Sequence, residues 1–260
     1  MLEFKEIDQN VEVINCDNCS NVITIPFMAN LRTLSCNNCI ALTSIPILPK
    51  LENLYCTGCR NLTSIPVLPK LKALYCADCI SLANIPKIPS LKHLICTGIT
   101  TVTKIPIFPK LKILACERCK GLTIIPSMLK LEILYCQRCI NITKIPNMPK
   151  LHTIYCTSCT ALTKIESPIL KKLHCESCKL LTEIPNIKTG EIRYLHTPWI
   201  SVNVDFSENI RALKRCQAIA KRKLTARKLE RAIPEIIAIY YSPGCKGEYL
   251  AMQSFTQQIK

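Results

Sequence analysis

The sequence contains little glycine, few acidic residues and no long apolar run. Only six of its 260 residues are glycine, which disfavours a nucleotide-binding fold built on glycine-rich loops. Acidic residues number 18 against 34 basic ones, giving a net charge of +16. This charge favours anionic partners (nucleic acid, acidic proteins or anionic membrane surfaces), although solubility alone would also explain it. Because no stretch reaches about 18 apolar residues, we expect no transmembrane helix.

Cysteine and proline are abundant instead, with 19 and 17 residues. In a secreted protein so many cysteines would imply disulfides. The N-terminal sequence MLEFKEIDQN, however, has neither the basic start nor the apolar run of a signal peptide. We therefore expect a cytosolic or nuclear protein whose thiols are reduced.

The chain is an internal repeat of 20 residues. Residues 51–70 read LENLYCTGCRNLTSIPVLPK and residues 131–150 read LEILYCQRCINITKIPNMPK. The pattern runs without insertion from Val11 to Ile165, followed by a ninth copy that is one residue short. A degenerate tenth copy, without cysteines, follows at Ile192 and Leu195.

The unit L-x-x-L-x-C-x-x-C-x-x-L-T-x-I-P-x-L-P-K resembles the leucine-rich-repeat signature L-x-x-L-x-L-x-x-N/C-x-L. Its short length and I-P-x-L-P end are similar to repeats of bacterial secreted effectors, and its cysteines to leucine-rich-repeat proteins of giant viruses. The resemblance implies a leucine-rich-repeat solenoid with a parallel β-strand face. We expect an N-terminal cap at 1–10, nine cysteine-bearing coils and the tenth over 11–200, and a small, basic α-helical segment at 201–260.

Each coil follows from residue alternation and proline chemistry. The fourth and sixth positions of the unit alternate with the fifth along a short strand, so both point to one face. The prolines at the sixteenth and nineteenth positions fix φ, remove N–H donors and extend the preceding residue. We therefore predict an extended, polyproline-like return segment. Because one coil cannot bury its own apolar face, neighbouring coils must stack.

Sixteen cysteines form eight C-x-x-C pairs, from Cys16/Cys19 to Cys175/Cys178. Taken alone, these pairs are a zinc signature. Within the repeat, both cysteines occupy inward slots, where free cysteine packs as a small hydrophobe. Ile99 replaces the second cysteine in one coil, and isoleucine can fill a core slot but cannot bind metal. We favour packing, with stacked zinc or iron–sulfur binding and disulfides as alternatives.

The fifth position of the unit should point outward and form a ladder. We predict that this strand face binds a partner, because tyrosine is enriched at protein interfaces. The alternative is that aromatic residues simply suit strands. The candidate binding residues are Tyr55, Tyr75, Ile95, Tyr135, Tyr155 and His174, together with His93 at the third position.

A stripe of lysines ends many of the coils. Stacked lysines repel one another and favour an anionic neighbour, but a solvated edge is the simpler interpretation. The stripe consists of Lys50, Lys70, Lys110, Lys130 and Lys150.

The repeat stops after about Val204, and residues 208–232 have helical apolar spacing with basic residues on the other faces. This segment could cap the solenoid core, bind nucleic acid or lie on a membrane surface. The candidate anion-binding residues are Lys214, Arg215, Lys221, Arg222 and Lys223.

None of the four histidines forms a recognisable catalytic constellation, and no phosphate-binding or dinucleotide motif is present. We therefore expect a non-enzymatic scaffold for protein–protein interaction, with no cofactor and a cytoplasmic location (host cytoplasm if the protein is viral). A metal-thiolate protein and a nucleic-acid-binding protein are the alternative functions. The sequence indicates neither the partner's identity nor the oligomeric state.

Overall fold

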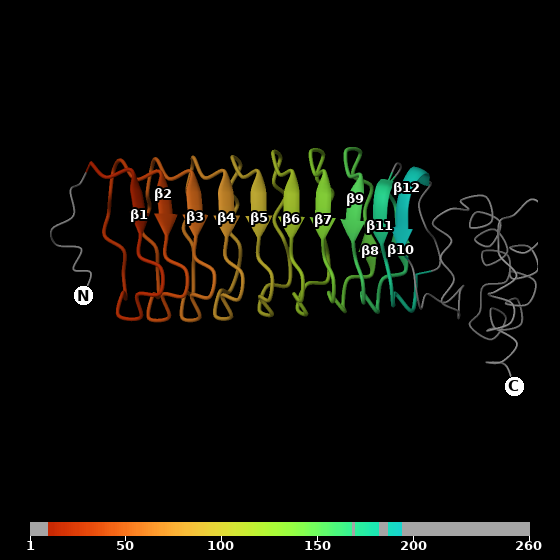
Figure 1. Ribbon diagram of the computed structural model, residues 1–260, viewed down its shortest axis with the longest axis horizontal. Helices are drawn as coiled ribbons and strands as arrows, with labels where there is room; N and C mark the ends of the chain where they lie inside the picture. Colours follow the sequence, from red (N-terminus) through yellow and green to blue (C-terminus); the bar gives the residue numbers. More distant parts are fainter. Residues whose placement is uncertain (1–9, 168–169, 182–186, 194–260) are drawn as a thin grey trace, which may run out of the picture.

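The computed structural model describes residues 10–167, 170–181 and 187–193, which form an elongated row of coils with their strands side by side (Figure 1). Its strands are β1 (Val13–Asn15), β2 (Thr33–Ser35), β3 (Asn53–Tyr55), β4 (Ala73–Tyr75), β5 (His93–Ile95), β6 (Ile113–Ala115), β7 (Ile133–Tyr135), β8 (Lys144–Ile145), β9 (Thr153–Tyr155), β10 (Lys164–Ile165), β11 (Leu170–His174) and β12 (Ile187–Arg193).

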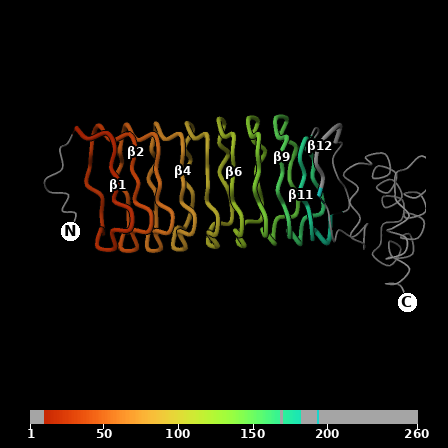
Figure 2. The backbone as a smooth tube through the Cα atoms, viewed as in Figure 1, coloured from red at the N-terminus to blue at the C-terminus, as the bar shows by residue number. Residues whose placement is uncertain are grey.

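Ten of these strands form one parallel sheet in the order β1-β2-β3-β4-β5-β6-β7-β9-β11-β12. Neighbouring strands pair in register with the repeat, so that Leu54 lies opposite Leu74 and Tyr55 opposite Tyr75. Equivalent positions of successive coils therefore stack directly, about 4.8 Å apart. This confirms the predicted parallel-strand solenoid, whose tube-like winding is clear in Figure 2.

The sheet continues beyond the ninth coil through β12, in which Ile192 pairs with Leu173 of β11. The pairing between these strands shifts register between Leu170 and Lys172, where the repeat loses its strict spacing. Leu195, the other residue assigned to a tenth repeat, lies outside the described residues. So do most of the predicted N-terminal cap (1–10) and the whole predicted helical segment (201–260).

The return segments are extended, as the prolines predict. Residues of successive return segments form isolated parallel bridges, such as Thr24 with Ser44, and β8 pairs with β10. No helix occurs within residues 10–167, 170–181 and 187–193.

One continuous core fills the interior, because each coil contributes the same inward positions. In the third coil, Leu51, Leu54, Leu62 and Leu68 are fully buried and Ile65 nearly so. Burying each such side chain contributes about 1.5–3 kcal/mol relative to leaving it exposed. The core depends on stacking, since every coil presents these residues to the coils on both sides.

The turn after each strand places the eighth position of the unit in the left-handed region of φ. Gly58 and Gly98 occupy it at φ 75° and 80°, whereas Asn38 occupies it at 57° and Arg138 at 59°. Glycine suits this conformation because it lacks a Cβ, and asparagine because its short polar side chain can hydrogen-bond locally, whereas arginine has neither advantage. The turn therefore recurs even where the local residue opposes it.

Candidate interaction surface

From the second coil on, the second cysteine of each C-x-x-C pair lies in the core and links two coils. The Cys59 thiol donates a hydrogen bond to the carbonyl of Cys36, one coil earlier, at 3.0 Å between Sγ and O. The same bond, at 2.9–3.0 Å, is made by Cys39, Cys79, Cys119, Cys139, Cys159 and Cys178. These cysteines fill space and also satisfy a buried backbone acceptor.

The pKa values of the first cysteines of the C-x-x-C pairs agree with a packing role for these residues. Burial raises the pKa of the Cys16 thiol to about 12, and raises the pKa values of Cys76 and Cys175 well above the usual range. A neutral thiol is a poor metal ligand and nucleophile, because both roles need the thiolate. Within the described residues, no group of three or more histidine, cysteine or acidic side chains is arranged to hold a metal ion.

The coil lacking a second cysteine keeps the same packing. Ile99 is fully buried in the core cluster, in the slot that cysteine occupies elsewhere. Since isoleucine carries no donor, it cannot make the thiol–carbonyl bond to Cys76. Packing is therefore common to all the coils at this slot, whereas the hydrogen bond is not.

The predicted partner-binding tyrosines lie half-buried on the outward face of the sheet as two stacked pairs. The rings of Tyr55 and Tyr75 are 4.7 Å apart between centroids, inclined by 19°. The rings of Tyr135 and Tyr155 are 4.8 Å apart, inclined by 11°. The ring of His174 tilts against Tyr155 with centroids 4.6 Å apart. Stacking holds the rings against each other, and the half-buried side chains keep part of their surface toward solvent.

Between the two tyrosine pairs the ladder changes character. Ile95 and Ala115 occupy the fifth position there, and Ala115 is only 8% exposed. His93, the remaining predicted residue, is the first residue of β5, which ends at Ile95, and its side chain is half-buried. The structure thus brings the predicted residues onto one face, as two aromatic patches separated by a two-coil aliphatic stretch.

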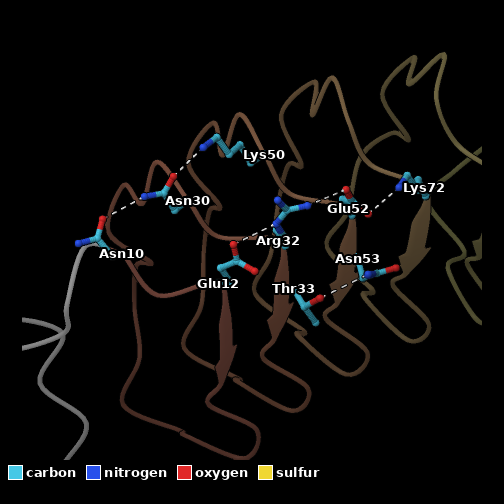
Figure 3. A network of polar contacts seen from close by, with 9 residues as sticks. All are labelled: Asn10, Glu12, Asn30, Arg32, Thr33, Lys50, Glu52, Asn53 and Lys72. Atoms are coloured by element: carbon cyan, nitrogen blue, oxygen red, sulfur yellow. Dashed lines mark hydrogen bonds and ion pairs between the residues drawn. The ribbon is translucent and has the colours of Figure 1, made fainter.

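Charged side chains at the second position of the unit form a ladder beside the strand face (Figure 3). Arg32 lies between Glu12 and Glu52, with N–O distances of 3.3 and 3.5 Å, and Lys72 contacts Glu52 at 2.6 Å. The hydrogen bond from Lys72 lowers the pKa of Glu52. Further along, Lys112 contacts Glu132 at 3.0 Å and lowers its pKa.

Sequence reasoning missed this second-position ladder, although its signal was present as charges recurring every 20 residues. A cationic contact to the aromatic face was missed for a different reason. Lys172 Nζ lies 5.6 Å from the centroid of Tyr155, but the shortened ninth coil obscures its position in the repeat. The predicted anion-binding residues Lys214, Arg215, Lys221, Arg222 and Lys223 lie outside the described residues.

A family model described as leucine-rich repeats in two copies matches residues 29–70. No curated protein matches the chain. The match and the parallel-strand solenoid together support a leucine-rich-repeat protein, and such repeats generally mediate protein–protein interactions without enzymatic activity. In the part of the chain that the structure describes, no helix is long and apolar enough to cross a membrane.

Proposed function

We propose that this protein is a non-enzymatic interaction scaffold that binds a protein partner through its strand face. The observation that carries the proposal is the pair of tyrosine stacks, Tyr55–Tyr75 and Tyr135–Tyr155, held half-exposed on a rigid sheet. Tyrosines ordered in advance lose little side-chain entropy on binding and present both apolar surface and a hydroxyl.

The resemblance to giant-virus repeat proteins extends the proposal to a viral origin and to the host cytoplasm. Reduced thiols suit that compartment. The thiol–carbonyl bonds between coils support it, because only a reduced cysteine can donate them.

The test replaces the four stacked tyrosines with serine and compares partner capture from extracts of the native host by quantitative mass spectrometry. Capture should be lost while the variant keeps its fold, its stability lowered only by the loss of the two ring stacks, about 0.5–1.5 kcal/mol each. The same partner must then bind the purified wild-type protein directly and fail to bind the variant. Retained binding by the tyrosine variant would reject this face.

A matched control removes exposed apolar side chains from the return segments instead. Four such residues are 55–65% exposed, so their replacement by serine also deletes large surface side chains. They are Phe27, Ile47, Val67 and Ile107. The control variant should capture the partner as the wild type does, and a loss of capture there would move the binding site to the opposite surface.

A further inference from the structure

The second-position ladder changes from balanced to purely basic along the solenoid. Acid and base alternate from Glu12 through Arg32 to Glu52. Three lysines then follow in consecutive coils: Lys72, Lys92 and Lys112. No acidic residue occurs in the sequence between Asp78 and Glu117. The fifth coil, residues 91–110, therefore has no carboxylate side chain of its own.

Backbone pairing holds these lysines in register. The Lys92 N–H donates to the Lys72 carbonyl at 2.7 Å, and the Lys112 N–H to the Lys92 carbonyl at 2.8 Å. The three side chains therefore start about 4.8 Å apart, well within a Debye length of about 8 Å at physiological salt. Like charges that start so close together repel one another, which favours an anion near them.

The flanking lysines are neutralised from their outer sides. Lys72 reaches back to Glu52 at 2.6 Å, and Lys112 reaches forward to Glu132 at 3.0 Å. Both ammonium groups thus lean away from Lys92, for which no carboxylate lies within ion-pairing distance among the residues that the structure describes. In the alternating part of the ladder, a glutamate would stand at the position that Lys92 occupies.

We propose that the Lys72–Lys92–Lys112 triplet binds an acidic polypeptide segment, whose carboxylates pair with Lys92 and reach the lysines on either side of it. The molecule's own contacts favour a carboxylate ligand, because glutamate already pairs with both flanking lysines. The half-buried His93 and Ile113 lie next to the triplet on the strand face, so the same segment can continue over that face. This inference builds on the proposed scaffold function and names the chemistry of its partner.

The lysine stripe at the end of each coil is interrupted at the same place. Ser90 replaces lysine there, and its hydroxyl donates to the Leu71 carbonyl at 2.7 Å. Lys70 and Lys110 remain on either side of it. Two residues before Lys92, the stripe therefore carries a short side chain that is hydrogen-bonded within the protein and stands between two further cations.

The test uses a fluorescein-labelled oligoglutamate peptide as probe and measures its affinity for the full chain by fluorescence anisotropy. The informative variant is Lys92→Glu, which supplies the missing carboxylate from the chain itself. It should weaken probe binding roughly tenfold, because three lysine contacts are lost together. It should also raise the melting temperature by about 1–3 °C through new pairs with Lys72 and Lys112.

Lys104→Glu is the matched control, since it makes the same charge change at an exposed return-segment lysine. Its probe affinity should stay within about twofold of the wild type, because salt screens the effect of a charge that lies far from the triplet. Equal weakening by both variants, or by neither, would overturn the proposal. Equally tight, Lys92-dependent binding of a single-stranded oligonucleotide of the same charge would overturn the assignment to an acidic polypeptide.

The tyrosine-to-serine variant separates this inference from the proposed function. It should bind the oligoglutamate probe as the wild type does, because it keeps all three lysines. If that variant still captured the protein partner, the tyrosine face would be rejected while the probe experiment continued to report on the triplet alone.

Discussion

The interior of the solenoid repeats from coil to coil, whereas its strand face and second-position ladder do not. Inside, leucine, isoleucine and cysteine recur at the same buried positions from the second coil to the eighth. Outside, the fifth position changes from tyrosine to isoleucine and alanine and back, and the second position changes from alternating charges to three lysines. Stability comes from the repetition, and recognition can come only from the departures, because an identical surface would offer no unique site.

The largest expected effect is a loss of folding stability at alkaline pH, where the cysteine thiols ionise in the unfolded chain. Buried thiols such as Cys16, with a pKa of about 12 against an ordinary 9.0, stay protonated when the unfolded chain has already ionised. Their contribution is complete below pH 9 and disappears as the pH rises toward the folded-state pKa. Above pH 9, each such thiol lowers the free energy of unfolding by roughly 1.4 kcal/mol per pH unit. Several thiols together therefore exceed a typical total stability of about 5–15 kcal/mol.

We therefore expect the protein to unfold between about pH 9 and 11. Denaturant titrations followed by circular dichroism at a series of pH values would measure this. Replacing Cys76 and Cys175 by valine should make the decline shallower, since burial raises both pKa values. A free energy of unfolding that stays constant across this range would contradict the assignment of these thiols as buried and neutral.

Neighbouring residues on one strand allow a direct comparison of the inside with the outside. Leu134 is fully buried in β7, and Tyr135, the next residue, stacks on the outward face. Leu134→Ala should cost about 2–5 kcal/mol because it leaves a cavity. Tyr135→Ala should cost about 0.5–1.5 kcal/mol through lost stacking. Urea unfolding of both variants measures the difference, and equal costs would erase the distinction between core and surface on this strand.

The repeat period made the interior predictable from the sequence. Strict 20-residue spacing places β1 to β7 and β9 and assigns each position of these coils to the inside or outside. Ile99 indicated that the second cysteine slot is a core slot. The thiol–carbonyl bonds were not predictable, since they depend on how the turn presents the preceding coil's carbonyl. The pairing of tyrosines into stacks depends on rotamers, which a periodic pattern does not specify.

The charged ladder could have been predicted from the sequence, but only by comparing the same position in successive coils. The ladder Glu12–Arg32–Glu52–Lys72 appears only when the second positions of successive coils are aligned. Lysines at the twentieth position were more obvious because they share one residue type. The segment after residue 200 has no period to align, so its cap or nucleic-acid roles remain predictions.

The coil with Ile99 allows the hydrogen bond to be separated from packing. Cys139→Ala removes the thiol donor to the Cys116 carbonyl and should cost about 1–3 kcal/mol. Ile99→Cys loses apolar volume but adds a donor toward the Cys76 carbonyl, so its net change should stay within about 1 kcal/mol. Thermal unfolding of both variants provides the measurement. A larger loss in Ile99→Cys than in Cys139→Ala would mean that packing alone determines this slot.

The turn after each strand is a boundary between the repeating interior and the variable surface. At Gly58, with φ 75°, an added Cβ would meet the Asn38 side chain. Gly58→Ala should therefore cost about 1–2 kcal/mol. Arg138→Gly, at φ 59°, should stabilise the protein by about 0.5–1 kcal/mol. If both variants changed the melting temperature in the same direction, backbone conformation would not be the determining factor.

The smallest expected effect concerns the charged ladder, and it has the opposite pH dependence to the cysteines. Lys72 lowers the pKa of Glu52 below its ordinary 4.5, so this contribution is present above about pH 4.5 and disappears as the pH falls through the lowered value. Glu52→Gln should therefore lower the melting temperature slightly at pH 7 and leave it unchanged near pH 3. Because Glu52 is at the surface, added salt should also remove the difference at pH 7. If the difference in melting temperature between the variant and the wild type persisted at high salt, the ladder would belong to the rigid core. The contrast between a uniform interior and a variable surface would then fail at Glu52.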